Sequence, residues 1–389
     1  MRPETSLLLA TGGGPALDGL ITRVARTALD WALFLRLTAA ERAEAIVSAR
    51  LSKLAPAMPD DIRSQLAGLA LRSDLRMTLL SQRLTETLTA FANAGIPVVL
   101  LKGAALGRIV YGSLPRRPML DLDLLVPRHM RAQAREVALG AGWLPTEYDR
   151  LAGFYDGHYH IAPLLDSRGR SFHLEIHSAL FPTGHPFAWP MEAFWARSEP
   201  LSGTGARVPS REDLLLHVAL HFSWSHLAQF GPWRTFRDVR AQADEPRLDW
   251  DRFVSLARES RGASAAFWTL RLARRYAGAA IPDEVERALL PALPASVLPM
   301  LERHFAGQWC NPDAPCPSRR LERGLWRLAI RPHWSEHGSS VPWERNPLFH
   351  DPESARPPVE PVGLKLVRHL SSPGRYLRYL HRITLGADS

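Results

Sequence analysis

Two aspartates, Asp121 and Asp123, lie two residues apart in an otherwise apolar run that extends from Leu120 to Val126. In a β-strand, successive side chains point to opposite faces, so the two carboxylates share a face, with Cα atoms roughly 6–7 Å apart. Like charges this close are unfavourable unless a cation or an arginine lies between them. We interpret the pair as metal ligands; the alternative is an exposed strand whose aspartates pair with arginines such as Arg117.

A third acidic residue, Glu175, lies in the alternating segment Phe172 to His177. Alternation places His173, Glu175 and His177 on one face of a strand. A carboxylate on a second strand of the same small sheet would complete a site of three acids. Without the aspartate pair, Glu175 would be an ordinary strand residue.

An apolar run from Pro97 ends in Lys102-Gly103-Ala104. A glycine lets the backbone come close to an anion, and the first N–H groups of a following helix favour negative charge. Lys102 is one of only three lysines among 48 basic side chains, and a compact ammonium suits phosphate. Lys102 and Arg117 are therefore candidates for neutralising phosphate, or for simply pairing with the aspartates.

The apolar spacing predicts the elements that position these residues. Residues 22–37, 39–54 and 59–94 carry apolar side chains at helical spacing, and Gly95 followed by Pro97 predicts the stop. Strands and helices then alternate, and the predicted segments are strand 97–102, helix 104–111, strand 120–126, helix 128–141, and the antiparallel strands 157–165 and 170–179.

Helices return after Pro182, with predicted bounds 210–224, 233–243, 250–260, 263–276, 283–290, 295–304 and 317–330, and Ser210 as an N-cap. The sequence thus predicts an α+β fold, a small mixed-sheet core flanked by N-terminal helices and a C-terminal helical lobe. The predicted parts are an N-terminal helical region 1–95, an α/β core 96–205, a helical lobe 206–331 and a proline-rich tail 332–389.

The tail ends in a basic amphipathic segment, 364–385. We favour a helix that docks on the protein; weak contact with an anionic membrane surface is the alternative. His217 and His221 are one helical turn apart, a spacing that can bind zinc, but no third ligand is apparent, so we favour buried histidines.

The composition limits the classes of protein. The chain of 389 residues is 46% hydrophobic, enough for two or three packed domains. Two cysteines, Cys310 and Cys316, are too few for a disulfide scaffold, and neither a membrane span nor a signal peptide is evident, so a cytoplasmic location is expected. The charge of +9 suggests nucleic acid, but the arginines are scattered, so nucleic acid is not the expected partner.

The order of strand, glycine turn, helix, Asp-x-Asp strand, helix and later acidic strand resembles the polymerase-beta-like nucleotidyltransferase fold. More closely, residues 101–105, 117–126, 174–177 and 214–221 are similar to a bacterial family of uncharacterised nucleotidyltransferases, over roughly residues 70–300. The resemblance implies transfer of a nucleoside monophosphate from an NTP such as ATP to a hydroxyl-type group, with pyrophosphate leaving.

The same resemblance implies site roles. Asp121, Asp123 and Glu175 would be the catalytic residues and the ligands of Mg²⁺, as two ions.

The nucleotide would be bound by Lys102, Gly103, Ala104 and Arg117. Ala104 departs from the superfamily, which usually has Gly or Ser there, so a hydroxyl contact to phosphate is missing. The implied acceptor is a small molecule or peptide of a biosynthetic pathway, with His173 and His177 beside it. The alternative is a non-catalytic nucleotide-binding or scaffold protein on the same fold.

Overall fold

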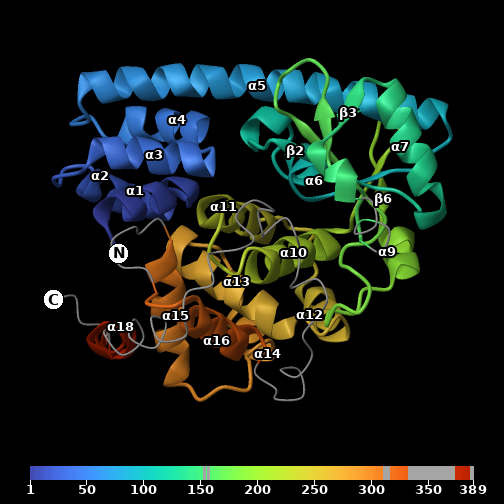
Figure 1. Ribbon diagram of the computed structural model, residues 1–389. Coiled ribbons are helices and arrows are strands. Elements are labelled where there is room, and N and C mark those ends of the chain that lie inside the picture. The colour runs from blue at the N-terminus through green and yellow to red at the C-terminus, as the bar shows by residue number, and fades with distance from the viewer. Residues whose placement is uncertain (152–154, 156–157, 310–315, 332–372, 386–389) are drawn as a thin grey trace, which may run out of the picture. The chain divides into compact units, whose positions relative to one another are not determined.

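The computed structural model describes residues 1–151, 155, 158–309, 316–331 and 373–385 (Figure 1). The chain groups into two compact units. One, here the core unit, comprises Arg2–Thr183 and Phe187–Leu290, and the other, the C-terminal unit, comprises Met1, Gly184–Pro186 and the residues from Pro291 onward. Every predicted site residue lies in the core unit. The predicted division at residues 95, 205 and 331 stays a prediction.

The N-terminal part is helical, as predicted, and consists of α1 (Pro3–Gly12), α2 (Asp18–Val24), α3 (Trp31–Glu41), α4 (Glu44–Leu54) and α5 (Asp60–Asn93). The sequence prediction missed α1. With 34 residues, α5 is about 50 Å long, and it contacts α4 near one end and the sheet helix α7 (Arg131–Gly140) near the other (Figure 1). Gly95 follows α5 with φ +67°, the left-handed conformation expected of a helix stop.

One mixed sheet lies at the centre of the predicted α/β core. Its strands are β1 (Val99–Leu100), β2 (Asp121–Leu125), β3 (Trp143–Pro145), β4 (Leu164–Asp166), β5 (His173–His177), β6 (Glu199–Pro200) and β7 (Arg207–Val208). Their order is β3-β4-β5-β2-β1-β7-β6, with β2 parallel to β5 and antiparallel to β1. The α+β class is confirmed, and so is the antiparallel pairing of β4 with β5.

All four predicted strands are shorter in the structure, and two of them lose most of their length. The predicted strand 97–102 retains only β1, because Lys102 is already the first residue of α6 (Lys102–Ile109). The predicted strand 157–165 retains β4 and one isolated bridge between His160 and His177. An apolar run can be recognised in the sequence, but a strand ends where its hydrogen bonds to the neighbouring strand end. The sequence of one segment does not show that point.

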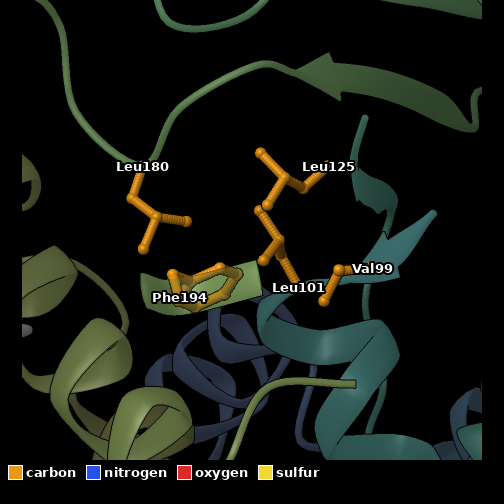
Figure 2. Packing of buried hydrophobic residues seen from close by; sticks show 5 residues of the cluster. All are labelled: Val99, Leu101, Leu125, Leu180 and Phe194. Carbon is orange, nitrogen blue, oxygen red and sulfur yellow. The ribbon is translucent and has the colours of Figure 1, made fainter. Parts of the chain in front are cut away.

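A compact apolar cluster supports the end of β2. Leu125 packs with Val99, Leu101 and Leu180, and with Phe194 of α9 (Met191–Arg197) (Figure 2). All five side chains are at most 2% exposed. Leu125 has the same parity as Asp121 and Asp123, so this face of β2 passes from exposed carboxylate to apolar core within five residues.

The remaining helices of the core unit are α10 (Arg211–Leu220), α11 (Pro232–Ala243), α12 (Trp250–Glu259), α13 (Ala263–Ala277) and α14 (Asp283–Ala288). Ser210 caps α10 as predicted, since its hydroxyl accepts a hydrogen bond from the Asp213 N–H at 3.1 Å. After α10 the chain forms one π-helical stretch, His221–Ser225. Such stretches are frequent at functional sites.

The C-terminal unit contains α15 (Val297–Gln308), α16 (Arg319–Ile330) and α18 (Pro373–Leu385). The α18 helix packs on α15, where Arg303 Nε donates to the Ile383 carbonyl at 2.5 Å, as the docking interpretation predicts. Residues 332–372, which include part of the predicted tail helix, lie outside the described residues. In the described part of the chain, no helix has both the length and the apolarity needed to cross a bilayer.

Candidate functional site

The parallel pairing of β2 with β5 brings the predicted acids together. Asp121 lies opposite His173 and Asp123 lies opposite Glu175 in the strand register. All four side chains therefore belong to one face of two neighbouring strands. Asp121 is exposed at the start of β2, whereas Asp123 is only 3% exposed.

A group suited to a metal ion lies on this face. Asp123, Glu175 and His177 each offer a ligand atom, and these atoms lie within 4.8 Å of one another. Among the described residues, no other group of three or more His, Cys, Asp or Glu side chains brings its ligand atoms this close together. Asp121 lies outside the group, and His177 takes part although the sequence assigned it only to the surroundings.

Lys102 reaches the same carboxylate from the start of α6. Its Nζ lies 2.8 Å from Asp123 Oδ1, and His177 Nε2 lies 2.9 Å from that same oxygen. The backbone at Lys102 has φ +42°, a left-handed conformation that costs a residue with a side chain about 1–2 kcal/mol. Strain of this kind clusters at functional sites, where the surrounding structure imposes it.

The ionisation of these groups is interdependent. Burial alone would raise the pKa of the Asp123 carboxyl, but Lys102 and His177 outweigh burial and hold this pKa well below its usual range. Burial likewise opposes ionisation of Glu175, yet the hydrogen bond from His177 lowers the pKa of that carboxyl. Burial disfavours the charged imidazole of His177, but the hydrogen bonds to both acids raise its pKa. The two acids are thus held as carboxylates.

Gly103 has a packing role in this structure. A Cβ atom at this position would lie 3.0 Å from Met119 Sδ and 3.2 Å from Arg117 Nη1. The left-handed residue of the turn is Lys102, not the glycine that the sequence suggested. The N–H of Ala104 donates to the Leu101 carbonyl at 3.1 Å.

Arg117 is anchored to the helical part of the core unit. Its Nε and Nη2 donate to both carboxylate oxygens of Asp238 in α11, with Nη2 2.7 Å from Oδ2. Tyr111 donates its hydroxyl to the same carboxylate at 2.9 Å. Arg117 therefore has a carboxylate partner other than Asp121 or Asp123. No local sequence signal identifies a partner 121 positions away.

Aromatic and imidazole rings border the Glu175 side of the site. The ring of His160 lies 5.2 Å from that of His177, and Tyr159 lies 5.6 Å from His177, measured between ring centroids. His158 lies 4.3 Å from His160. Burial lowers the pKa of His158 to about 3 and that of His160 to about 4, so both are neutral near pH 7. These residues were not predicted from the sequence, although His158 and His160 are two residues apart, a spacing that places both side chains on one face of an extended segment.

A second row of histidines comes from α10 and the π-helical stretch. His217, His221 and His226 are all neutral at pH 7, because burial lowers each pKa and the charge of Lys102 lowers it further. His217 is 1% exposed, and its Nδ1 has no hydrogen-bond partner. Among the described residues, these histidines belong to no group whose ligand atoms are close enough to hold a metal ion. This agrees with the prediction that His217 and His221 are buried histidines rather than zinc ligands.

The chemistry of the ligand atoms fits a hard divalent cation. Asp123 and Glu175 supply carboxylate oxygens from adjacent strands, which are the ligands that Mg²⁺ prefers. The ammonium of Lys102, 2.8 Å from Asp123, shows that positive charge is stabilised at this position. The exposed carboxylate of Asp121 lies on the same face, toward solvent.

One comparison with known proteins identifies the family of this chain. The family model described as uncharacterised nucleotidyltransferase matches residues 27–278, well over half of the chain and all of the site. The chain therefore belongs to this family and is an enzyme of the nucleotidyltransferase class. Comparison with curated proteins and with solved structures gave no match.

Proposed function

We propose that this member of the nucleotidyltransferase family transfers a nucleoside monophosphate from an NTP to a hydroxyl-type group of a small-molecule or peptide acceptor. The observation that carries the proposal is the register of Asp123 with Glu175 on adjacent parallel strands, with Lys102 at 2.8 Å from Asp123. The proposal includes that the acceptor belongs to a biosynthetic pathway and that the protein is cytoplasmic. The cytoplasmic location rests on the low number of cysteines, two in the chain.

Asp123 and Glu175 would hold Mg²⁺, with Asp121 as a further carboxylate on the solvent side of the same face. When bound, the metal neutralises phosphate charge and polarises the reacting phosphorus centre. Glu175 is suited to accept the proton of the acceptor hydroxyl, because it is ionised and 24% exposed in its side chain.

Lys102 would bind a phosphate oxygen of the nucleotide. Its stem is flexible and its ammonium is already oriented toward the carboxylates, so a small movement transfers this charge from Asp123 to the substrate. Gly103 and Ala104 keep the start of α6 free of bulky side chains, at the helix end whose N–H groups favour an anion. Arg117 would position this turn through Asp238 and contribute positive charge.

The acceptor would lie on the Glu175 side. His158, His160 and Tyr159 border that side, and neutral imidazoles offer hydrogen bonds without the cost of burying charge. This wall suits a polar, uncharged acceptor group, such as a hydroxyl, close to His177.

Thermal-shift titration of the full chain tests the proposal. Each NTP is added with and without Mg²⁺ to the wild type, to Asp123→Asn and to the control Asp61→Asn, whose side chain is exposed in the first turn of α5. We expect one NTP to raise the melting temperature of the wild type and the control only with Mg²⁺, and to leave Asp123→Asn unchanged.

Pyrophosphate release then separates catalysis from binding. An enzyme releases pyrophosphate in proportion to the nucleotide attached to its acceptor, whereas a scaffold protein binds the NTP and releases none. Equal shifts for the wild type and Asp123→Asn would remove the carboxylate site from the proposal.

A further inference from the structure

Helix α18 of the C-terminal unit carries three kinds of side chain on three separate stripes. Each stripe repeats at a spacing of three and four residues, so its members lie along one side of the helix. The stripes consist of Tyr376, Tyr379 and Ile383, of Leu377, Leu380 and Thr384, and of Arg375, Arg378 and Arg382. An ordinary surface helix has one apolar side and one polar side, so the second apolar stripe of α18 requires an explanation.

The tyrosine stripe, Tyr376 to Ile383, fixes α18 to its own unit. Tyr379 is 5% exposed and Ile383 is 2% exposed. The Tyr379 hydroxyl lies 2.5 Å from His304 Nδ1, and Gln308 Nε2 donates a hydrogen bond to the same hydroxyl at 3.1 Å. Both partners belong to α15, which packs against α18. Because this side is held by α15, the helix cannot rotate to bury its other apolar stripe.

The leucine stripe, Leu377 to Thr384, is exposed. Leu377 is 67% exposed, Leu380 is 38% exposed, and Leu385 at the end of the helix is 68% exposed. These three are among the nine exposed large apolar side chains of the described residues, although α18 has only 13 residues. A single exposed leucine is normal, but a row of them on a fixed helix indicates a surface that binds a partner.

The arginine stripe makes one edge of this surface basic. Arg375 and Arg378 are exposed, and among the described residues neither forms an ion pair. The Arg382 guanidinium lies 5.2 Å from the ring centroid of Tyr379. Helix α18 contains no aspartate or glutamate, and Glu302 of the neighbouring α15 is only 4% exposed. Exposed leucines beside positive charge are complementary to a bilayer with anionic headgroups.

We propose that α18 binds the protein to an anionic membrane surface. The helix lies in the plane of the surface, with Leu377 and Leu380 among the acyl chains and with Arg375 and Arg378 at the headgroup phosphates. The tyrosine stripe stays on α15, so binding requires no rearrangement of the helix. A row this short gives weak, reversible binding that depends on anionic lipid. The proposal rests on α18 and α15 alone and is independent of nucleotidyl transfer.

Flotation of the full chain with lipid vesicles tests this surface. One set of vesicles is phosphatidylcholine, and the other contains about one quarter phosphatidylglycerol, an anionic lipid. We expect the wild type to bind only the anionic vesicles, and to bind them less as the salt concentration rises. Leu377→Gln/Leu380→Gln should weaken binding by about tenfold, and Arg375→Gln and Arg378→Gln should each weaken it by about fivefold.

Matched controls come from α5 in the core unit. Leu71 and Leu75 lie one turn apart and are 72% and 60% exposed, and Arg72 is exposed beside them. Leu71→Gln/Leu75→Gln and Arg72→Gln should bind vesicles like the wild type. Folding of every variant is checked by its melting temperature. A wild type that does not bind anionic vesicles overturns the proposal, as does a folded Leu377→Gln/Leu380→Gln variant that binds as tightly as the wild type. Equal losses in the α5 controls also overturn it.

Two further measurements test other occupants of the same surface. In sedimentation velocity without lipid, a wild-type dimer that the Leu377→Gln/Leu380→Gln variant loses would overturn the membrane assignment in favour of a second copy of the chain. A single-stranded RNA that displaces the vesicles, and whose binding depends on the arginines but not on the leucines, would overturn it in favour of nucleic acid. Leucine-dependent binding to anionic vesicles by a protein that releases no pyrophosphate supports the membrane surface while refuting the proposed reaction.

Discussion

Lys102 and Asp123 form an ion pair, with Nζ 2.8 Å from Oδ1, although the Lys102 backbone must adopt φ +42° to make it. The lysine lies at the junction of β1 and α6, and the aspartate lies in the centre of the sheet. Burial alone would lower the pKa of the Lys102 ammonium, but Asp123 and Glu175 raise it above its ordinary value. The fold therefore pays a local conformational cost to keep one positive charge beside the carboxylates.

Replacing Lys102 with alanine and with glycine separates backbone from charge. Both changes remove the ammonium, but only glycine adopts φ +42° without strain. We expect Lys102→Gly to be more stable than Lys102→Ala by about 1 kcal/mol in urea unfolding. An alanine variant as stable as the glycine variant would contradict the left-handed conformation.

Asp121→Asn and Asp123→Asn should differ in stability and agree in ligand binding. Asp121 is exposed, so its replacement should change the free energy of unfolding by less than about 0.5 kcal/mol. Asp123 is 3% exposed and neutralises Lys102, so Asp123→Asn should lower the free energy of unfolding by more than 1 kcal/mol. Both should abolish the Mg²⁺-dependent NTP shift. A full shift in Asp121→Asn would exclude Asp121 from the site.

The pair of Arg117 and Asp238 should show strong coupling in a double-mutant cycle. Arg117→Met leaves the Asp238 carboxylate, 1% exposed, without its bidentate partner, and should cost about 3–5 kcal/mol. Adding Asp238→Leu removes the unpaired charge, so the double variant should be more stable than the sum of the single effects by roughly 1–3 kcal/mol. Additive free energies of unfolding would show that the pair contributes no coupling.

His217 should make the protein sensitive to acid. Burial lowers the pKa of His217 to about 3 from an ordinary value of 6.5. Below pH 6.5 the unfolded chain binds a proton that the folded chain cannot, so stability falls as the pH falls. At pH 5 this single group should cost about 2 kcal/mol relative to pH 8.

His217→Leu removes the titrating imidazole, so the unfolded chain no longer binds a proton at this position. We expect urea unfolding of the variant between pH 8 and pH 5 to show a pH-dependent loss smaller than that of the wild type by about 2 kcal/mol. An identical loss in the two proteins would mean that His217 is protonated in the folded state.

The strand face that carries Asp121, Asp123 and Glu175 could be predicted from the sequence. Alternation at Asp121 and Asp123, and again at His173 to His177, was enough to predict two strands with acids on one face, because the period of a strand is a local property. The stop at Gly95 and the cap at Ser210 were predictable for the same reason, since each depends on one residue and its nearest neighbours.

Tertiary structure alone decided which side chains meet. Arg117 pairs with Asp238 across 121 positions, and His177 of β5 meets Asp123 of β2. Such contacts depend on the packing of whole elements, so spacing along the chain carries no record of them. The sequence thus determined the residue types, the strand faces and the family of this protein. The fold determined which acid is buried, which lysine is strained and which carboxylate Arg117 binds.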